Sequence, residues 1–355
     1  MNSRRKKVSI LMSVYNGSRY LAESIDSILR QTFSDFEFII IDDCSTDDSW
    51  TILSAYAEVD SRIVLYRNDQ NLGLTKSLNK GLRAAKGIYI ARQDHDDVSL
   101  PHRLSEQVEF LEHNPQAVFV SSNIEIIDAN GQPLGIIDRA CTPTLVKWYL
   151  LFYNHIAGHS QVMFRKNPAL NLGGYNENYQ YVQDYEFWCR LSAVGQFYIL
   201  PKTHVQQRFH DGSISASKKE AQKNYVLERV GINLEPIIGY RLNPQKTLLL
   251  FNFWADPSMV CQFKEVHVLL TEICQAYFKE SCRQELDGNL ILEIQKVVAK
   301  NFLKISILTS FRKGLKQKIS ALRYAAVWHF QGTLIYSFRH YFKKSTEMFR
   351  DFSIT

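Results

Sequence analysis

The first hundred residues alternate between apolar runs typical of buried strands and segments with the apolar spacing of a helix. Strand-like runs occupy Val8–Tyr15, Phe36–Ile41 and Ile88–Ile90. Apolar residues recur at helical spacing in the intervening segments, at residues 20–29, 52–57 and 74–82. This repeat predicts an α/β fold with a mostly parallel, doubly wound sheet flanked by helices.

Polar residues follow these predicted strands where each one ends. Tyr15 closes the first strand, Asp43 follows the second, and Asp94 and Asp96 follow the third. Sheets of this kind bind their ligands at the carboxyl ends of the strands. The sequence therefore predicts a binding site in which these four residues lie at one edge of the sheet.

The run Asp94-His95-Asp96-Asp97 places three carboxylates within four residues. Like charges this close repel and raise one another's pKa unless a cation offsets them. A hard divalent ion such as Mg²⁺ or Mn²⁺ takes oxygen ligands and keeps open positions for phosphate oxygens. The run therefore indicates a metal site, and the alternative is a solvated acidic turn.

The first turn of the chain has neither the glycine fingerprint of a dinucleotide site nor a Walker lysine motif. A metal and basic side chains would therefore have to bind any phosphates. Arg92 and Lys76 are the best-placed cations, and for both the alternative is a solvated position on the surface.

Six segments follow one another in an order that resembles glycosyltransferase family 2, the inverting nucleotide-sugar enzymes with the Rossmann-like GT-A fold. The resemblance covers about the first 215 residues. The segments are Ser13–Asn16, Ile41–Asp47, Asn71–Gly73, Leu78–Gly81, Ala91–Asp97 and Gln183–Arg190.

The resemblance implies a donor site built from the strand ends. Ser13 and Tyr15 belong to the segment that contacts the nucleotide, with Tyr15 stacked on the base. Asp43 matches the carboxylate that binds the base, usually uracil. For Tyr15 the alternative is a core tyrosine at the end of a strand, and for Asp43 an aspartate that caps a turn. Asp94 resembles the first acid of the D-x-D signature, near the ribose and the metal.

The same resemblance assigns the metal ligands. Asp96 matches the direct ligand of the ion that bridges the two phosphates. His210 matches a histidine that some relatives use as a second ligand, with a structural role as the alternative. For Asp97 we consider two roles, a catalytic one and the capping of the helix that follows. His95, where the family usually has a small residue, is expected to point outward without a role.

Asp184 resembles the acid that serves as general base. Inversion is a single displacement in which the acceptor hydroxyl loses its proton, and one carboxylate suffices for that. Gln183 replaces the usual first carboxylate of this motif, and the alternative for Asp184 is the N-cap of a helix at 185–191. Trp188, one turn further, and His159 match acceptor-side positions, with a place in the core as the alternative for both.

The length of 355 residues allows a catalytic core and a smaller second part. We expect a GT-A domain at 1–216, with a nucleotide-binding half at 1–100 and an acceptor half at 101–216. The six cysteines have no C-x-x-C or zinc spacing, which favours free thiols in the cytoplasm. No apolar run approaches the roughly 18 residues of a membrane span, and no signal-peptide segment follows the basic start.

The segment 217–355 is expected to be mainly helical and basic. Residues 301–355 contain ten Lys and Arg against two acids. A basic amphipathic helix there would attach the protein to an anionic membrane surface on the inner face of the plasma membrane, or would pack on the catalytic domain. Nucleic-acid binding is not expected, because no binding motif accompanies the charge. The predicted apolar face consists of Phe311, Leu315, Ile319, Leu322, Ala326 and Phe330.

These features together predict an inverting glycosyltransferase that uses a nucleotide sugar, with UDP expected, and a glycan or lipid-linked acceptor in bacterial surface polysaccharide synthesis. The alternatives are a noncatalytic nucleotide-sugar binder and a nucleotidyltransferase. The second would need a glycine-rich basic loop after the first strand, and residues 16–20 do not form one. A noncatalytic binder would be expected to lack one of the acids Asp43, Asp94, Asp96 and Asp184, and all four are present.

Overall fold

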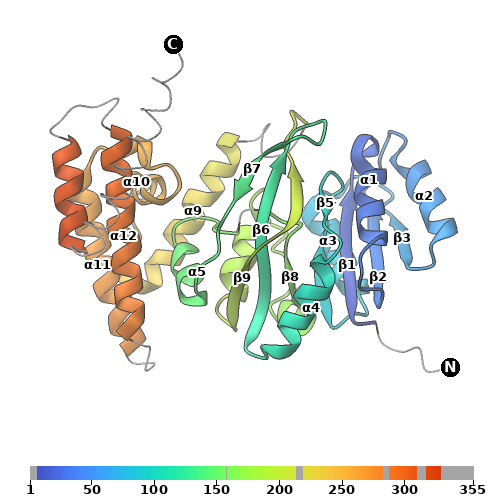
Figure 1. The fold of residues 1–355 in the computed structure, drawn as a ribbon, viewed down its shortest axis with the longest axis horizontal. Helices are drawn as coiled ribbons and strands as arrows, with labels where there is room; N and C mark the ends of the chain where they lie inside the picture. Colours follow the sequence, from blue (N-terminus) through green and yellow to red (C-terminus); the bar gives the residue numbers. More distant parts are fainter. Residues whose placement is uncertain (1–5, 157, 213–218, 283–287, 310–316, 329–355) are drawn as a thin grey trace, which may run out of the picture. The chain divides into compact units, whose positions relative to one another are not determined.

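A computed structural model describes residues 6–156, 158–212, 219–282, 288–309 and 317–328. The predicted α/β class with a mainly helical C-terminal region is confirmed (Figure 1). The strands are β1 (Val8–Val14), β2 (Phe36–Asp42), β3 (Ile63–Arg67), β4 (Tyr89–Arg92), β5 (Val98–Ser99), β6 (Ala117–Ile127), β7 (Pro133–Ile137), β8 (Met163–Arg165) and β9 (Gln196–Arg208).

The strands form one mixed sheet with the order β3-β2-β1-β4-β8-β6-β9-β5, and β7 pairs with β6. The first four neighbours in this order, β3 to β4, are mutually parallel. Antiparallel pairing begins at β8, which joins β4 to β6. The short β8 therefore connects the parallel half of the sheet to β6.

Helices cover both faces of the parallel half. The helices up to residue 191 are α1 (Ser18–Leu29), α2 (Ser49–Val59), α3 (Leu74–Ala84), α4 (Arg103–His113), α5 (Pro143–Tyr149), α6 (Lys166–Asn171) and α7 (Gln183–Leu191).

Alternate side chains of β1 point to opposite faces, as the pleat requires. Ile10 and Met12 lie in a buried cluster with Ile25 of α1 and Leu104 of α4. On the opposite face Gly81 of α3 lies over Leu11, where a Cβ at Gly81 would be 3.3 Å from the Leu11 side chain. The predicted doubly wound arrangement is therefore present around β1.

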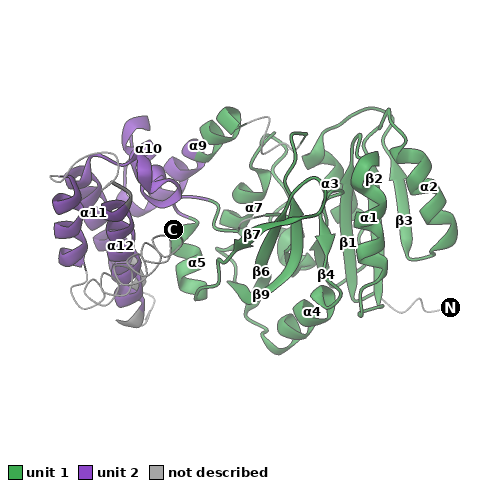
Figure 2. Cartoon of the chain, turned by 45° about the horizontal axis from the view of Figure 1, so that its top comes forward, with its two compact units in different colours: residues 1–150, 154–226 green, residues 151–153, 227–355 purple. Residues whose placement is uncertain are grey.

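The chain divides into two compact units, residues 1–150 with 154–226 and residues 151–153 with 227–355 (Figure 2). The expected boundary after residue 216 stays a prediction, since residues 213–218 lie outside the described part of the chain. The second unit is helical and contains α10 (Pro244–Ala255), α11 (Phe263–Cys282) and α12 (Gly288–Thr309), with η1 (Pro257–Met259) and helical residues 317–328, while α9 (Lys219–Ile238) contributes to both units.

Helical residues 317–328 pack through a different face from the predicted one. Ala321 and Ala325 are fully buried, and Tyr324 stacks on His267 of α11 with ring centroids 4.8 Å apart. Ile319, on the predicted apolar face, is instead 56% exposed. The small residues Ala321 and Ala325 allow close helix packing here, so the predicted apolar face, which includes Ile319, is not the face that makes this contact. Phe311, Leu315 and Phe330 lie outside the described residues.

No helix among the described residues is long and apolar enough to cross a membrane.

Gly87, two residues before β4, lies closely against the backbone at the start of β1. A Cβ at this position would lie 2.6 Å from the carbonyl carbon of Val8, where the chain enters β1. The Gly87 amide also donates to Ser9 Oγ at 2.7 Å, and that hydroxyl donates to Glu37. The position therefore requires glycine for reasons of space.

Gly87→Ala should lower the free energy of unfolding by about 2 kcal/mol, because the backbone of β1 must move to admit the methyl group. For a unit of this size the loss corresponds to roughly 4–8 °C in melting temperature. Differential scanning calorimetry would measure it, with Arg83→Ala on the exposed face of α3 as the matched control. An unchanged melting temperature for Gly87→Ala would contradict the close packing described here.

Candidate functional site

Three parallel strands bring the predicted donor-site residues to one edge of the sheet. Val14 is in register with Asp42, and the Asp43 amide donates to the Val14 carbonyl at 2.8 Å. On the other side of β1, the Gln93 amide donates to the Leu11 carbonyl at 3.0 Å. Tyr15, Asp43 and Asp94 therefore follow neighbouring strand ends, as the alternation predicted.

Tyr15 is 47% exposed, so the alternative of a core tyrosine is wrong. The exposed ring is placed to stack on a flat ligand, and its role as the base platform stays a prediction. Ser13 is buried in β1, two residues earlier.

Asp43 is buried and accepts hydrogen bonds from three donors of the loop that leads to α3. They are Asn68 Nδ2 at 2.7 Å, the Leu72 amide at 2.9 Å and the Gly73 amide at 2.8 Å. Gly73 has a φ of 87°, which favours glycine at this turn. Asp43 thus caps the loop, as its alternative role proposed, and its contact with a base stays a prediction.

Asp94 forms an ion pair with Arg92, in which Nη2 lies 2.7 Å from Oδ1. Burial raises the pKa of Asp94, but several opposing effects, of which the charge of Arg92 is the largest, together outweigh burial, and the pKa lies below its usual value. Arg92 has no exposed side-chain surface and also donates to the Leu11 carbonyl. The alternative of a solvated Arg92 is therefore wrong. A guanidinium without exposed surface cannot contact a diphosphate in this conformation, so we expect it to act through Asp94. Lys76 is exposed on α3.

The two predicted metal ligands lie together. His210 Nε2 is 3.0 Å from Asp96 Oδ2, and each side chain is 16% exposed. Tyr20 packs beside His210, with ring centroids 5.1 Å apart. A carboxylate oxygen suits both Mn²⁺ and Mg²⁺, whereas an imidazole nitrogen suits transition-metal ions, so this pair favours Mn²⁺ over Mg²⁺.

The described residues contain no group of three or more His, Cys, Asp or Glu placed to hold a metal unaided. Asp96 and His210 would therefore fill two positions of an ion and leave the others open. That arrangement fits an ion which is bound jointly with the phosphates of a substrate.

Asp97 does not cap the helix that follows, and its catalytic role stays a prediction. His102 is the N-cap of α4, whereas Asp97 is buried and accepts from Ser160 Oγ at 2.5 Å and from the Arg208 amide at 3.0 Å. Burial first, and then the charges of Asp96 and Asp94, raise its pKa well above the usual value. The Asp94 amide in turn donates to Ser160 Oγ at 2.9 Å. Asp97 therefore connects the acidic turn to β9 and to the segment before β8.

Two buried arginines support the acidic turn and were not singled out from the sequence. Arg208 donates through Nε to the Asp96 carbonyl at 3.1 Å and pairs with Glu23 at 2.6 Å. Arg103 donates to the Arg92 carbonyl at 2.7 Å and to Ser99 Oγ at 2.8 Å. Arginine is common on exposed helices and at strand ends, so only the tertiary fold reveals that these two are buried.

His95 is half-buried and contacts Gly17, so the expectation that it points outward is wrong. A Cβ at Gly17 would overlap its imidazole ring. Glycine after β1 thus makes room for the histidine that stands where the family usually has a small residue.

Asp184 lies in the first turn of α7, and the N-cap is Val182, whose φ is 54°. The alternative of Asp184 as the N-cap is therefore wrong. Burial raises its pKa above the usual value, although hydrogen bonds from the Tyr185 amide and from Asn154 oppose the shift. Asn154 Nδ2 lies 2.8 Å from Asp184 Oδ2. The nearby acid Glu186 is buried and bound to Arg190 at 2.7 Å, which leaves Asp184 as the available carboxylate of this turn.

Trp188 and His159 lie in the core beside the site. Trp188 has no exposed surface and packs edge-on against Phe119 with ring centroids 4.8 Å apart, so it cannot stack on a sugar. Burial, followed by the charge of Arg92, lowers the pKa of His159 to about 3, and its Nε2 lies 3.3 Å from the Tyr175 hydroxyl. A neutral, buried imidazole supports the structural alternative for His159.

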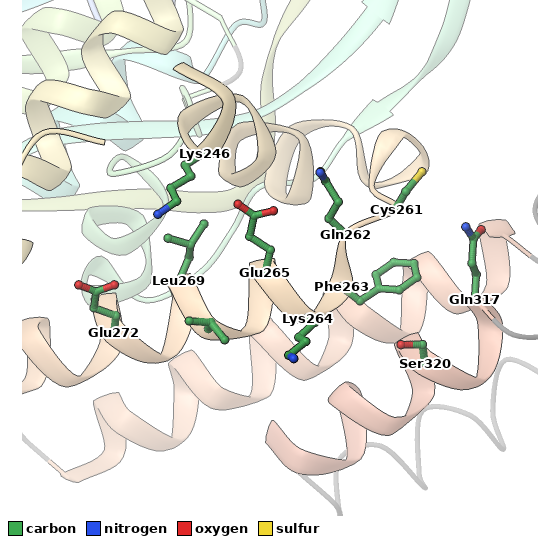
Figure 3. A pocket seen from close by; sticks show the side chains of 11 residues that line it. Lys246, Cys261, Gln262, Phe263, Lys264, Glu265, Leu269, Glu272, Gln317 and Ser320 are labelled. Carbon is green, nitrogen blue, oxygen red and sulfur yellow. The ribbon is translucent and has the colours of Figure 1, made fainter. Parts of the chain in front are cut away.

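A pocket of about 700 Å³ lies wholly within the second unit and contains none of the predicted site residues. Figure 3 shows a rim of mixed charge, with Lys246 and Lys264 near Glu265 and Glu272, around the apolar side chain of Leu269.

Comparison with known proteins agrees with this architecture. The model of the family "Glycosyl transferase family 2" matches residues 9–166. An "Uncharacterized glycosyltransferase" of Haemophilus influenzae is 32% identical over 255 residues, which are 65% of this chain and 77% of that protein. The chain belongs to glycosyltransferase family 2. This membership decides against the nucleotidyltransferase alternative.

Other relatives of this glycosyltransferase extend the comparison. Escherichia coli WfaP, a UDP-Glc:alpha-D-GlcNAc-diphosphoundecaprenol beta-1,3-glucosyltransferase, is 31% identical over 230 residues, or 63% of this chain and 87% of WfaP. The putative glycosyltransferase EpsE of Bacillus subtilis is 36% identical over 192 residues, or 53% of this chain and 68% of EpsE.

Solved structures support the GT-A fold. S. aureus TarS 1-349 in complex with UDP-GlcNAc has a TM-score of 0.55 and 17% identity, over 92% of each chain. The mannosyltransferase PcManGT of Pyrobaculum calidifontis, in complex with GDP-Man and Mn²⁺, has a TM-score of 0.51 and 15% identity, over 92% of this chain and 87% of that one.

Proposed function

We propose that this glycosyltransferase moves a sugar, with inversion, from a nucleotide diphosphate donor to a hydroxyl of a glycan or lipid-linked glycan. The proposal rests on the Asp96–His210 pair. This pair lies at the edge of the sheet where Tyr15 follows β1 and Asp94 follows β4. The complexes of TarS with UDP-GlcNAc and of PcManGT with GDP-Man support a nucleotide-sugar donor. We take uracil as the base from the family resemblance.

Asp96 and His210 would hold a divalent ion, Mn²⁺ or Mg²⁺, which offsets the charge that grows on the departing diphosphate when it is bound. Tyr15 would stack on the base. Arg92 holds Asp94 in place, and Asp97, through Ser160 and Arg208, fixes the turn that carries Asp96. These interactions let three nearby carboxylates coexist before a substrate enters.

Asp184 would accept the proton of the acceptor hydroxyl as the new glycosidic bond forms. Its raised pKa makes it a stronger base than a solvated aspartate, while it stays ionised above that pKa. Inversion requires no second nucleophile, so one carboxylate at this position is sufficient.

We also propose that the outer face of helical residues 317–328, with the basic residues after 301, attaches the enzyme to an anionic membrane. WfaP, by its name, acts on a diphosphoundecaprenol-linked sugar, and an acceptor of that kind lies at a membrane. Ile319 and Val327 are 56% and 63% exposed, and Arg323 between them is also exposed. Apolar and basic side chains on one face suit the interface of an anionic bilayer.

UDP should bind much more tightly with Mn²⁺ than without it. Without the ion, the side chains of Asp96 and His210 have no net positive charge that would attract the diphosphate. Titration calorimetry should show a loss of at least tenfold in affinity on addition of a chelator. Asp96→Ala should abolish the metal dependence, while Asp138→Ala on the exposed loop after β7 should preserve it. Equal affinity for UDP with and without the ion would contradict the proposed site.

Asp184→Asn should reduce turnover by roughly 100-fold or more, because the amide keeps the shape of the side chain but cannot take the proton. Binding of UDP with Mn²⁺ should stay within twofold of the wild type, roughly a 0.4 kcal/mol difference. Steady-state kinetics with an accepted substrate pair would measure the loss, and Asp138→Asn is the matched control. A near-normal rate for Asp184→Asn would show that another group is the base.

The full-length protein should float with vesicles of anionic lipid at low salt and be released at high salt, because salt screens the basic residues. The double variant Ile319→Ser/Val327→Ser should float less, since both side chains are exposed and their loss leaves packing intact. Val194→Ser, which changes an apolar side chain with 50% exposure in the first unit, is the control. Flotation that is the same for all three proteins would refute this surface.

A further inference from the structure

Asn154 contacts the carboxylate that we propose as the general base. Its Nδ2 donates to Asp184 Oδ2 at 2.8 Å, and its Oδ1 accepts from the Ile156 amide at 3.2 Å. A backbone N–H can only donate, so the amide oxygen of Asn154 must face Ile156. The NH₂ group must then face Asp184, which fixes the orientation of the asparagine side chain.

The backbone around Asn154 is held by its neighbour His155. That side chain is buried, its Nε2 lies 3.1 Å from the Arg139 carbonyl oxygen, and its ring stacks on Tyr149 with centroids 4.3 Å apart. Burial, followed by the charge of Arg139, lowers the pKa of His155 to about 3, so the ring is neutral. A neutral, stacked imidazole keeps the 154–156 turn in one position.

We infer that Asn154 is a positioning residue, which holds Oδ2 of the Asp184 carboxylate and so fixes the direction in which the carboxylate meets the acceptor hydroxyl. This inference rests on the proposed role of Asp184. Asn154 does not take part in proton transfer itself, because a neutral amide neither accepts nor releases a proton near neutral pH. It acts on the direction of the carboxylate and on its charge.

The sign of the electrostatic effect follows from the groups around Asp184. Burial and the charge of Asp94 raise the pKa of Asp184, while the Tyr185 amide and Asn154 lower it. The other titratable group that interacts with Asp184 is Tyr175, whose hydroxyl stays protonated because burial raises its pKa. Removal of the Asn154 donor should therefore raise the pKa of Asp184, and more of the base will be protonated at a given pH.

Asn154→Ala should move the titration midpoint of Asp184 upward by about one pH unit, the size expected for loss of one hydrogen bond to a charged group. Carboxyl ¹³C NMR of the full-length protein, labelled at aspartate and assigned with Asp184→Asn, measures the midpoint without any substrate. Asn154→Ser should give the same shift, because its hydroxyl is too short to reach Asp184. Asn130→Ala, exposed in the β6–β7 turn, should give none.

The same shift should appear in catalysis. The assay uses saturating Mn²⁺ and the UDP- or GDP-sugar that the enzyme hydrolyses fastest. In the pH profile of kcat/KM, the acidic side should move to higher pH by about one unit in Asn154→Ala. The rate loss should then be about tenfold larger below the midpoint than on the alkaline plateau, where only the lost orientation of the carboxylate contributes to it.

A midpoint that is the same in Asn154→Ala, Asn154→Ser and the wild type would overturn the inference. If Asp184→Asn is inactive while this midpoint does not move, only the role of Asn154 fails. If Asp184→Asn remains active, the proposed base fails, whatever the NMR midpoint shows. A protein that melts normally but loses activity equally at every pH would also count against the inference, because a role in packing alone predicts that result.

Discussion

Three carboxylates within residues 94–97, in the turn that follows β4, repel one another, and the site depends on how each of them is offset. Each has a different partner: Asp94 pairs with Arg92, Asp96 lies against His210, and Asp97 accepts from Ser160 and the Arg208 amide. Unpaired buried carboxylates would destabilise the fold or become protonated. The partners come from β4, from the segment before β8 and from the end of β9.

This distribution of partners explains why a mixed sheet suits the site. The parallel strands β2, β1 and β4 place Tyr15, Asp43 and Asp94 at one edge. The antiparallel strand β8 then positions the segment before it, which contains Asn154 and Ser160, and β9 pairs with both β6 and β5 and delivers Arg208 and His210. The hydroxyl of Ser160 therefore links the metal turn to the segment that also contains Asn154.

The sequence predicts the parts of this arrangement that depend on local pattern. Alternating strand and helix patterns predict the parallel sheet, and polar residues at strand ends predict the edge at which they meet. Other features depend on contacts between distant segments. Asp97 and Ser160 meet only because β8 pairs with β4, and nothing near either residue indicates it. Trp188 follows Asp184 by one helical turn, but that spacing cannot tell whether the ring faces solvent or Phe119. The apolar pattern of residues 317–328 does not reveal which face packs in the second unit, because Ala321 and Ala325 pack closely without a large apolar side chain.

The central claim is that Asp96 and His210 hold a divalent ion jointly with the diphosphate of the donor. Crystals grown with UDP and Mn²⁺, measured at a wavelength where manganese scatters anomalously, test it most directly. The account predicts one strong anomalous peak within bonding distance of Asp96 Oδ2, His210 Nε2 and an oxygen of each phosphate, with the uracil on Tyr15. UDP bound at this edge with no peak between Asp96 and His210, or with the ion held elsewhere, would contradict it.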